Sequence, residues 1–477
     1  MIPKQEIIDA ATRYGLLPNI VEKDYVLGWL LAGISNHDAF RETWVFKGGT
    51  CLKKCFFETY RFSEDLDFTL KDEAHIDADF LTDAFGEIGD WIYDQSGIAI
   101  PRDGLRFDVF ENPRGNPSCQ GRVSYQGPIS PTKGGLPRVK LDLTADEHLV
   151  LDPVTSSVFH PYSDEPDAGI SLMSYAYEEA FSEKIRALGE RTRPRDLYDV
   201  VNLYRLTDAR PPAATLLNVL RAKCEFKEIA VPTITAIERH RDAVEAAWEQ
   251  MLRHQLPVLP PVAVFWNELP AFFDWLMGAA APAALAPVPR SAGDALIRER
   301  RLNLGVGFQA ESAMEVVRFA AANRLRIDID YTKLNGERTQ RRIEPYSLRR
   351  SQAGDILLHG FDVQRQEMRS YRVERINSAS AAGESFTPRY EIELTSTGAL
   401  PIRDNPPREE RALRVHTSPV RRRSIRRSST GPTHIYECSY CGKRFRRKAR
   451  NSKLNKHNDK SGYPCPGRTG FYVDTKY

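Results

Sequence analysis

One short stretch constrains this 477-residue chain more than any other: Phe46 to Leu70, FKGGTCLKKCFFETYRFSEDLDFTL. It sets a glycine pair before a short helical segment and then an Asp-x-Asp on a predicted strand. Side chains alternate between the two faces of a strand, so Asp65 and Asp67 project to the same side, while Leu66 and Phe68 can be buried. Two carboxylates placed in this way on a rigid strand favour a Mg²⁺ (or Mn²⁺) site.

The glycine pair adds a phosphate site to the predicted metal site. Gly48 and Gly49, followed by Thr50, allow backbone amides near a helix start to approach a phosphate closely. A metal beside a phosphate cradle is typical of nucleotidyl transfer, in which positioning and charge neutralisation supply most of the catalysis. An acidic pair alone more often lies on a solvated strand, and the glycine motif is what favours the catalytic interpretation.

Further motifs surround this stretch in a fixed order. EKDY (residues 22–25) opens a helix before it, RFSEDLD (61–67) overlaps its end, and a later helix pair carries Glu183-Lys184 and RDLYD (195–199). Together, over roughly residues 1 to 275, these motifs resemble the AbiEii/AbiGii family of nucleotidyltransferase toxins, within the polymerase-β-like nucleotidyltransferase superfamily. The resemblance implies an α/β (α+β) core with a helical subdomain, an NTP substrate and a role in a toxin–antitoxin or phage-defence system.

The resemblance assigns the catalytic metal to three carboxylates. Asp65 and Asp67 would hold it, and Asp142 matches the third acidic residue of the superfamily, which binds metal or acts as a base towards the attacking hydroxyl. Asp142 stands on a predicted strand, Arg138–Thr144, in which apolar and polar residues alternate. An aspartate on the exposed face of such a strand is otherwise usually only solvated.

Two later residues take active-site roles from the same resemblance. Lys184 matches a lysine that contacts nucleotide phosphate, because a compact ammonium charge can neutralise a triphosphate; a surface lysine paired with Glu183 or Glu179 is the alternative. Asp196 matches a motif that organises the active site, although it also lies in a first helical turn, where the helix dipole favours a carboxylate. Arg195 and Asp199 would support it. The nucleotide-binding residues implied are Gly48, Gly49, Thr50, Ser63 and Lys184.

Composition divides the chain into five parts. The stretch GAAAPAALAPVPRSAG, at residues 278–293, breaks regular structure and marks the clearest boundary. We expect a nucleotidyltransferase domain at 1–277, a linker at 278–295, a small β-barrel domain at 296–400, a basic flexible linker at 401–432 and a basic zinc-bound module at 433–477.

The predicted barrel segment shows strand alternation and a hairpin signal at Asn335-Gly336. Residues 341–376 resemble a WYL-type domain, although Ile-Leu-Leu (356–358) replaces the tripeptide that names that family. WYL-like domains often sense ligands or nucleic acid in bacterial defence proteins and transcription regulators. Arg369 and Arg372 are therefore candidates for nucleic-acid contact, and solvated edge charges are the alternative.

The tail carries a Cys-x-x-Cys…His…Cys order, which suits a closed, tetrahedral and structural Zn²⁺ site. The ligands would be Cys438, Cys441, His457 and Cys465, with His434 as a possible substitute. Cations interleaved with Phe445 between these ligands suit contact with phosphate backbones. The nucleic-acid candidates of the tail are Arg421, Arg422, Arg423, Arg444, Arg446, Arg447 and Lys448.

The charge distribution agrees with a nucleic-acid partner. Residues 403–477 hold 20 Lys and Arg against 6 Asp and Glu, whereas the remaining chain holds 47 against 58. An acidic body with a basic tail indicates nucleic-acid contact, and a solvated, disordered tail is the alternative. Seven cysteines, no secretory signal and no apolar run of about 20 residues predict a cytoplasmic protein without a membrane partner.

These observations predict a toxin that transfers NMP from an NTP, with Mg²⁺, to an acceptor. The family resemblance favours an RNA acceptor such as a tRNA 3′ end, and a cognate antitoxin as partner. A second hypothesis is a nucleic-acid-sensing regulator whose core only binds nucleotide. A third is that the C-terminal half restrains the toxin in cis.

Overall fold

The computed structural model describes residues 1–57, 61–130, 135–279, 285–289, 297–299, 312–394, 433–438, 443–447, 454, 456, 457, 465 and 470–476. The chain forms two compact units, Met1–Arg403 and Asp404–Tyr477, and each is described by itself.

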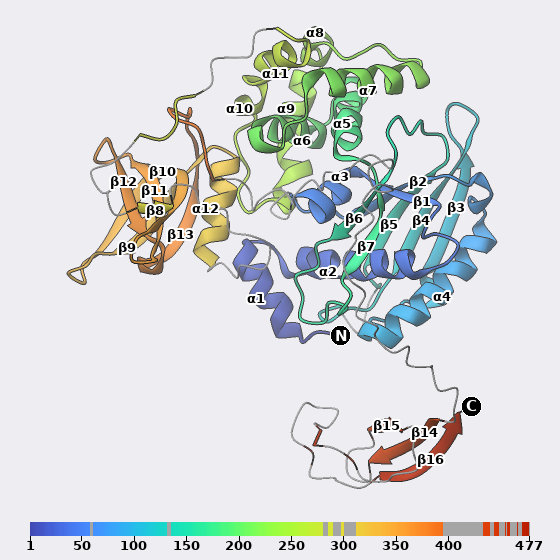
Figure 1. Ribbon diagram of the computed structural model, residues 1–477. Coiled ribbons are helices and arrows are strands. Elements are labelled where there is room, and N and C mark those ends of the chain that lie inside the picture. The colour runs from blue at the N-terminus through green and yellow to red at the C-terminus, as the bar shows by residue number, and fades with distance from the viewer. Residues whose placement is uncertain are drawn as a thin grey trace, which may run out of the picture. The chain divides into compact units, whose positions relative to one another are not determined.

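A seven-stranded mixed sheet forms the centre of the first unit (Figure 1). Its strand order is β3-β4-β5-β2-β1-β7-β6. Strand β2, which carries the Asp-x-Asp, runs parallel to β5 and antiparallel to β1. The strands are β1 (Trp44–Lys47), β2 (Asp65–Leu70), β3 (Leu105–Glu111), β4 (Pro117–Ser124), β5 (Arg138–Thr144), β6 (Val154–Val158) and β7 (Ile170–Ser174).

In the described part of the chain, long helices cover one face of this sheet. Helices α2 (Pro18–Asn36) and α4 (Ala78–Ser96) lie across it, with α1 (Lys4–Tyr14) packed beside α2 (Figure 1). The alternation in β2 and β5 explains the choice of face, because Leu66 and Leu141 point into the buried core while the intervening polar residues point away. The other face of strands β2 and β5 carries polar side chains.

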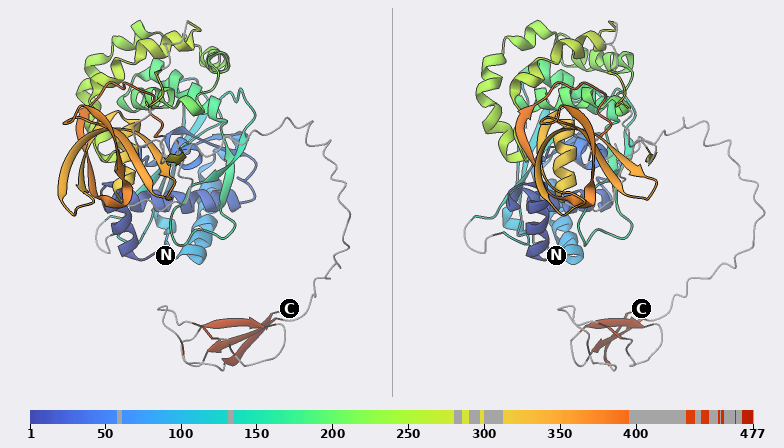
Figure 2. Two further views of the ribbon diagram at one scale, coloured as in Figure 1. Left: turned by 60° about the vertical axis from the view of Figure 1, so that its left-hand side comes forward. Right: turned by 90° about the vertical axis from the view of Figure 1, so that its left-hand side faces the viewer.

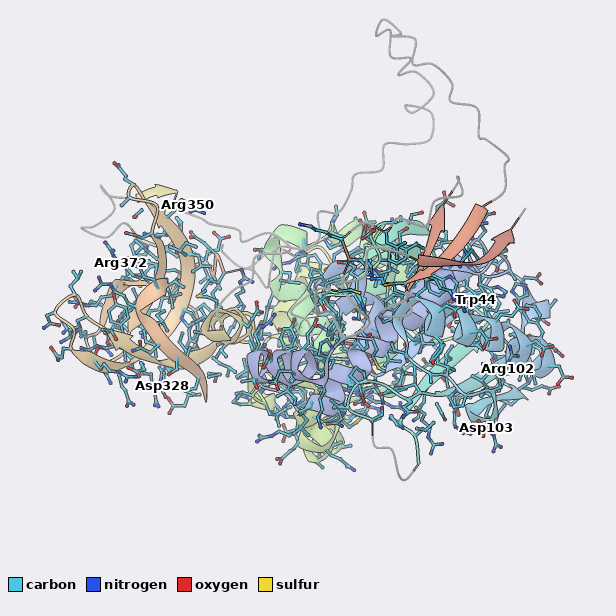
Figure 3. The ribbon with its side chains drawn as sticks, turned by 90° about the horizontal axis from the view of Figure 1, so that it is seen from below. Trp44, Arg102, Asp103, Asp328, Arg350 and Arg372 are labelled. Carbon is cyan, nitrogen blue, oxygen red and sulfur yellow. The ribbon has the colours of Figure 1, made fainter. Side chains whose placement is uncertain are left out.

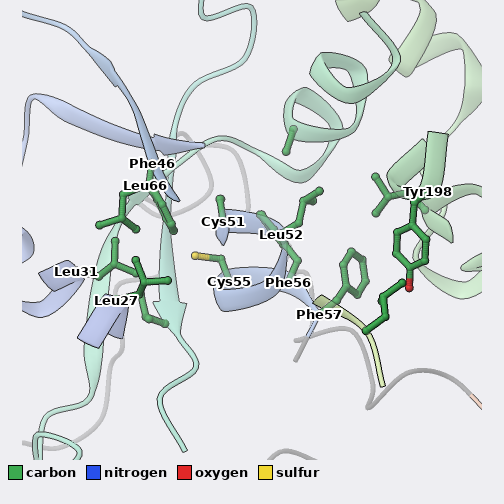
Figure 4. Close-up of a cluster of buried hydrophobic side chains, with 14 of the residues drawn as sticks. Leu27, Leu31, Phe46, Cys51, Leu52, Cys55, Phe56, Phe57, Leu66 and Tyr198 are labelled. Atoms are coloured by element: carbon green, nitrogen blue, oxygen red, sulfur yellow. The ribbon is translucent and has the colours of Figure 1, made fainter. Parts of the chain in front are cut away.

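A buried turn anchors the glycine pair to the core. Helix α3 (Gly48–Cys51) continues into a π-helical turn, Leu52–Phe56. Side chains of both segments lie in one apolar cluster with α2 and β2 residues (Figure 4). The apolar packing of this turn therefore holds the loop after β1 in place.

Helices dominate the second half of the nucleotidyltransferase-like region, as predicted. Pro194 begins α6, which suits the first position of a helix because proline lacks the backbone N–H that would be unpaired there. The helices are α5 (Tyr177–Arg191), α6 (Pro194–Arg205), α7 (Ala213–Phe226), α8 (Ile234–Glu238), α9 (Arg241–Leu252), α10 (Val262–Trp266) and α11 (Leu269–Leu276).

A second, antiparallel sheet follows in the order β12-β11-β10-β9-β13, and β8 (Ile297–Glu299) also pairs with β10. The predicted hairpin is confirmed, because β9 and β10 pair on either side of Gly336, whose φ of +83° suits a tight turn. This sheet curls around α12 (Ser312–Ala322), as the right-hand view of Figure 2 shows. Its strands are β9 (Leu325–Thr332), β10 (Arg338–Ser351), β11 (Ile356–Asp362), β12 (Glu367–Arg372) and β13 (Ile376–Ser385).

The curled sheet and the helical subdomain share polar contacts within the first unit. Glu268, before α11, accepts hydrogen bonds from Arg205 and from Arg324, which joins α12 to β9. Val288, from the predicted linker, is buried in a small cluster with Tyr346 of β10. The linker segment 285–289 thus packs on the curled sheet.

The second unit contains a three-stranded antiparallel sheet in the order β15-β14-β16. Its strands are β14 (Thr433–Cys438), β15 (Arg444–Arg447) and β16 (Gly470–Lys476). Across the described residues of both units, no helix is long and apolar enough to cross a membrane.

Candidate active site

Two of the predicted catalytic carboxylates lie side by side on the open face of the large sheet. The register of β2 and β5 places Asp67 opposite Asp142, and Asp65 opposite Lys140. Burial and the neighbouring Asp142 raise the pKa of Asp67 to about 6, although Lys47 and Lys184 oppose this shift. Negative charge is therefore concentrated where a cation would relieve it.

The donor set fits a hard divalent cation that the substrate helps to bind. Among the described residues, Cys438, His457 and Cys465 are the one group of three or more possible ligands whose donor atoms all lie within 4.8 Å of one another. The three aspartates are thus more widely spaced. Mg²⁺ is usually held by one or two carboxylates together with substrate phosphates and water, and carboxylate oxygens on β2 and β5 suit that mode.

Close approach explains both glycines of the loop. A Cβ added to Gly48, whose φ is +82°, would lie 2.0 Å from Oδ2 of Asp67. A Cβ on Gly49 would lie 2.8 Å from the Arg61 guanidinium and 3.3 Å from Oγ of Ser63. Any larger side chain would displace these groups. The buried Thr50 hydroxyl donates to the Asp65 carbonyl and so ties the loop to β2.

A buried carboxylate fixes Lys184 beside the aspartates. Nζ of Lys184 lies 2.7 Å from Asp199, whose two oxygens also accept from Arg61 at 2.7 and 2.8 Å. Burial alone would raise the pKa of Asp199, but Arg61 and Lys184 outweigh burial and hold this pKa well below its usual range. Glu179 and Glu183 form their own pairs, with Lys223 and Arg186 respectively. The proposed alternative partners of Lys184 are therefore engaged elsewhere.

Asp196 binds an arginine next to the acidic site. It is fully buried at the start of α6 and accepts two hydrogen bonds of 2.8 Å from Nε and Nη2 of Arg191. Those hydrogen bonds raise the pKa of Arg191, and the nearby Asp67 charge raises it further. Asp196 thus orients a cation towards the acidic site. Its catalytic role stays a prediction.

Sequence reasoning missed a second lysine at this site. Lys47, the last residue of β1, pairs in register with Asp67, and its Nζ lies 3.2 Å from Oε1 of Glu147. Burial would lower the pKa of Lys47, but Tyr175, Glu147, Glu183 and Asp67 together raise it. The ammonium therefore stays charged. The position of Lys47 directly before the glycine pair is the feature of the sequence that could have identified it as a site residue.

The two arginines singled out in the curled sheet each face a carboxylate. Arg369 lies 2.6 Å from Glu367, and Arg372 lies 3.1 Å from Asp355. Figure 3 shows Arg372 at the periphery of this sheet. Their charges are balanced locally, and contact with nucleic acid stays a prediction.

The second unit brings three of the predicted zinc ligands together. Sγ of Cys438 lies 3.8 Å from Sγ of Cys465, and His457 completes the group. Two thiolates on a tetrahedral Zn²⁺, each with a Zn–S distance of about 2.3 Å, would be about 3.8 Å apart, so the donor set and its spacing fit zinc. Arg444 is exposed nearby on β15. The predicted residues Arg421, Arg422, Arg423, Cys441 and Lys448, and the side chains of Arg446 and Arg447, lie outside the described part of the chain.

This chain is similar to two solved proteins over part of its length. MenT4, a nucleotidyltransferase toxin from Mycobacterium tuberculosis H37Rv, is 17% identical over 59% of this chain and 91% of its own, with a TM-score of 0.37. Proteasome accessory factor B/C (PafBC) of Arthrobacter aurescens is 17% identical over 62% of this chain and 41% of its own, with a TM-score of 0.16.

Two protein families match successive parts of the chain. Residues 312–381 match the WYL domain, which corresponds to α12 and the strands that curl around it. Residues 29–278, more than half of the chain, match the family described as nucleotidyl transferase AbiEii toxin, type IV TA system. Both predicted resemblances are confirmed, and the protein belongs to the AbiEii family of nucleotidyltransferase toxins.

Proposed function

We propose that this protein transfers NMP from an NTP to a hydroxyl of an RNA acceptor, such as a tRNA 3′ end, and acts in the cytoplasm as a toxin with a cognate antitoxin. The acceptor oxygen forms a bond to the α-phosphorus. The bond from that phosphorus to the oxygen bridging to the β-phosphate breaks, and pyrophosphate leaves. The observation that carries the proposal is the in-register pair Asp67 and Asp142 beside the glycine loop.

Asp65 and Asp67, together with Asp142, would hold Mg²⁺ or Mn²⁺, which when bound neutralises phosphate charge and polarises the α-phosphate. Residues of the chain itself bind the phosphates and supply positive charge. Because Gly48 and Gly49 have no side chains, the loop backbone lies directly against Asp67 and Arg61 and can offer its amides to a phosphate in the space beside the aspartates. Lys184, held by Asp199, and Lys47, held by Glu147, supply fixed positive charge around that space.

Asp142 is suited to receive the proton of the attacking hydroxyl. It is exposed, and Nε2 of Gln120 donates a long hydrogen bond of 3.4 Å to its Oδ1. A weakly bonded, accessible carboxylate can turn towards an incoming hydroxyl. Asp67, in contrast, lies against Gly48 and is fixed.

The second unit supports the choice of a nucleic-acid acceptor. Residues 403–477 carry a large excess of Lys and Arg, and the Cys/His cluster would hold structural Zn²⁺. Basic side chains on a metal-fixed fold suit phosphate backbones. The WYL match at 312–381 also supports the second hypothesis, a nucleic-acid-sensing regulator whose core only binds nucleotide.

The test is a transfer assay with the four α-³²P NTPs, Mg²⁺ and total bacterial RNA. We expect the wild type to label a discrete RNA band, Asp65→Ala to abolish the label, and Asp83→Ala, at an exposed site on α4, to leave it unchanged. Label that enters protein but no RNA would overturn the acceptor. No label with any NTP, while Asp65→Ala keeps full affinity for DNA, would favour the regulator.

A further inference from the structure

A row of cations crosses the open face of the large sheet, starting at the catalytic carboxylates. The register places Asp65 opposite Lys140, Lys140 opposite Arg122, and Arg122 opposite Arg106. All four side chains share one face, because paired residues of neighbouring strands point to the same side. With strands about 4.8 Å apart, the row extends roughly 14 Å from β2 to the sheet edge at β3.

The row is accessible to a large partner. Helices α2 and α4 cover the other face (Figure 1). Lys140 is exposed, and the side chains of Arg106 and Arg122 are 69% and 32% exposed. No described ion pair includes Lys140, so its ammonium is available. The cations of this row thus face away from the buried core.

Fold stability does not explain such an arrangement. Like charges directly opposite each other on neighbouring strands are destabilising, and Arg122 faces a cation on both sides. Two carboxylates offset part of the repulsion. Asp65 is in register with Lys140, and Asp108 accepts from Arg106 at 2.8 Å and from Arg122 at 2.9 Å. That shared carboxylate aligns the two guanidinium groups and still leaves the row with net positive charge.

An exposed aromatic ring lies on the same face. Phe110 follows Asp108 by two residues on β3, which places it on the same side, and it is 48% exposed. The ring lies four residues along β3 from Arg106, about 13 Å at the rise of a strand, so a single strand of nucleic acid can stack a base on it while neighbouring phosphates bind the cations.

We propose that Lys140, Arg122, Arg106 and Phe110, here named the acceptor strip, bind the single-stranded 3′ end of the acceptor RNA. The cations would contact backbone phosphates, and Phe110 would stack on a base. The strip ends at Asp65, next to the Asp67–Asp142 pair, so a strand lying along it brings its terminal hydroxyl to the catalytic carboxylates. This inference rests on the proposed transfer to nucleic acid.

The test compares the full-length protein with the double variant Arg106→Ser/Arg122→Ser. We expect the KM for RNA to rise about tenfold or more, with the KM for NTP and the melting temperature unchanged. The salt dependence of RNA binding should also weaken, by about 0.7 in log–log slope for each phosphate that the variant no longer neutralises. Arg41→Ser, an exposed arginine paired with Asp38 between α2 and β1, is the matched control. An unchanged KM for RNA in the double variant would overturn the inference.

A crosslinking experiment separates failure of the strip from failure of the proposed reaction. A single-stranded RNA with 4-thiouridine a few nucleotides before its 3′ end should crosslink to β3 or β4 of the wild type, and Phe110→Ala should reduce the yield. Crosslinking there without any transfer would support the strip and reject RNA as the substrate. Transfer to RNA with crosslinks only in residues 404–477 would reject the strip and keep the reaction.

Discussion

Asp199 holds the Lys184 ammonium at 2.7 Å and binds two nitrogens of Arg61 with the same carboxylate. The three groups come from α6, α5 and the segment before β2, so one buried anion joins the helical subdomain to the loop that leads into the Asp-x-Asp. The geometry that places Lys184 near Asp67 is therefore also part of the folded core.

Replacing Asp199 by Asn should destabilise the protein, because Arg61 and Lys184 would remain buried without their counter-charge. Breaking a buried ion pair in this way costs about 3–5 kcal/mol. Urea unfolding of the Asp199→Asn variant measures this loss. Asp83→Asn, on the exposed side of α4, should behave as the wild type. A wild-type unfolding midpoint for Asp199→Asn would show that the three-group contact contributes little.

Lys184→Met should separate catalysis from stability. The Arg61–Asp199 pair remains in this variant, so the loss of unfolding free energy should be smaller than for Asp199→Asn. The transfer rate should nevertheless fall by about 100-fold, since removal of one charge that stabilises a transition state typically has that effect. Steady-state kinetics with varied NTP provides the measurement. A variant that is destabilised but transfers at the wild-type rate would make Lys184 purely structural.

Local patterns predicted much of the fold. Strand Arg138–Thr144 has the bounds that its alternation of apolar and polar residues predicts. Strand β4, Pro117–Ser124, is harder to recognise from its sequence, because glycine interrupts the apolar alternation. A Cβ at Gly121 would lie 2.8 Å from Phe107, so packing against β3 requires glycine there.

The candidate site was only partly predictable, because part of it depends on packing between distant segments. The Asp-x-Asp, its glycine loop and Lys184 occur in short motifs that a single sequence displays. The partner of Arg61, in contrast, is Asp199, 138 residues away. Lys47 lies next to Asp67 only because β1 pairs with β2. Register and long-range pairing are set by tertiary packing, which no local pattern specifies.

The zinc site leads to a prediction about metal content. We expect purified protein to contain one zinc per chain, because closed Cys and His sites bind structural zinc tightly. Cys438→Ser and Cys465→Ser should each lose the metal, and the region after residue 432 should become sensitive to protease. Cys119→Ala, at a buried thiol on β4, is the control and should retain zinc. Elemental analysis measures the zinc content per chain, and one zinc per chain in Cys465→Ser would exclude Cys465 as a ligand.

His160 should make the first unit less stable in acid. Its ring is fully buried against α2, where a Cβ on Gly28 would lie 2.0 Å from Nδ1, and burial and Lys54 lower its pKa to about 3. A depressed pKa means that the unfolded chain takes up the proton first, so stability is complete above about pH 6.5 and falls as the pH drops towards 3.

The expected loss at pH 4.5 is about 2–3 kcal/mol relative to pH 7.5, from two pH units at about 1.4 kcal/mol each. Urea unfolding at both pH values measures it in the wild type and in His160→Gln. The variant should be less stable at pH 7.5, yet show a smaller loss on acidification. Equal acid sensitivity in both proteins would assign the effect to other groups.

Glu268 controls the contact between the helical subdomain and α12. It accepts hydrogen bonds from Arg205 and Arg324, and burial, reinforced by Arg205, lowers the pKa of Arg324 to about 10. Glu268→Ala would leave two cations facing each other in a largely buried site. We expect a loss of about 3–5 kcal/mol in unfolding free energy and faster proteolysis within residues 278–296.

The same variant tests whether the C-terminal half restrains the enzyme in cis. Deleting everything after Met277 would also uncover the apolar surface of α1 that packs on α12, so a single substitution at the contact is the cleaner experiment. Restraint through this contact requires Glu268→Ala to transfer NMP faster than the wild type at a temperature where both are folded. Glu245→Ala, which breaks an exposed pair with Arg241 on α9, should change neither rate nor stability. An unchanged rate in Glu268→Ala, despite the loosened contact, would reject self-inhibition by this route.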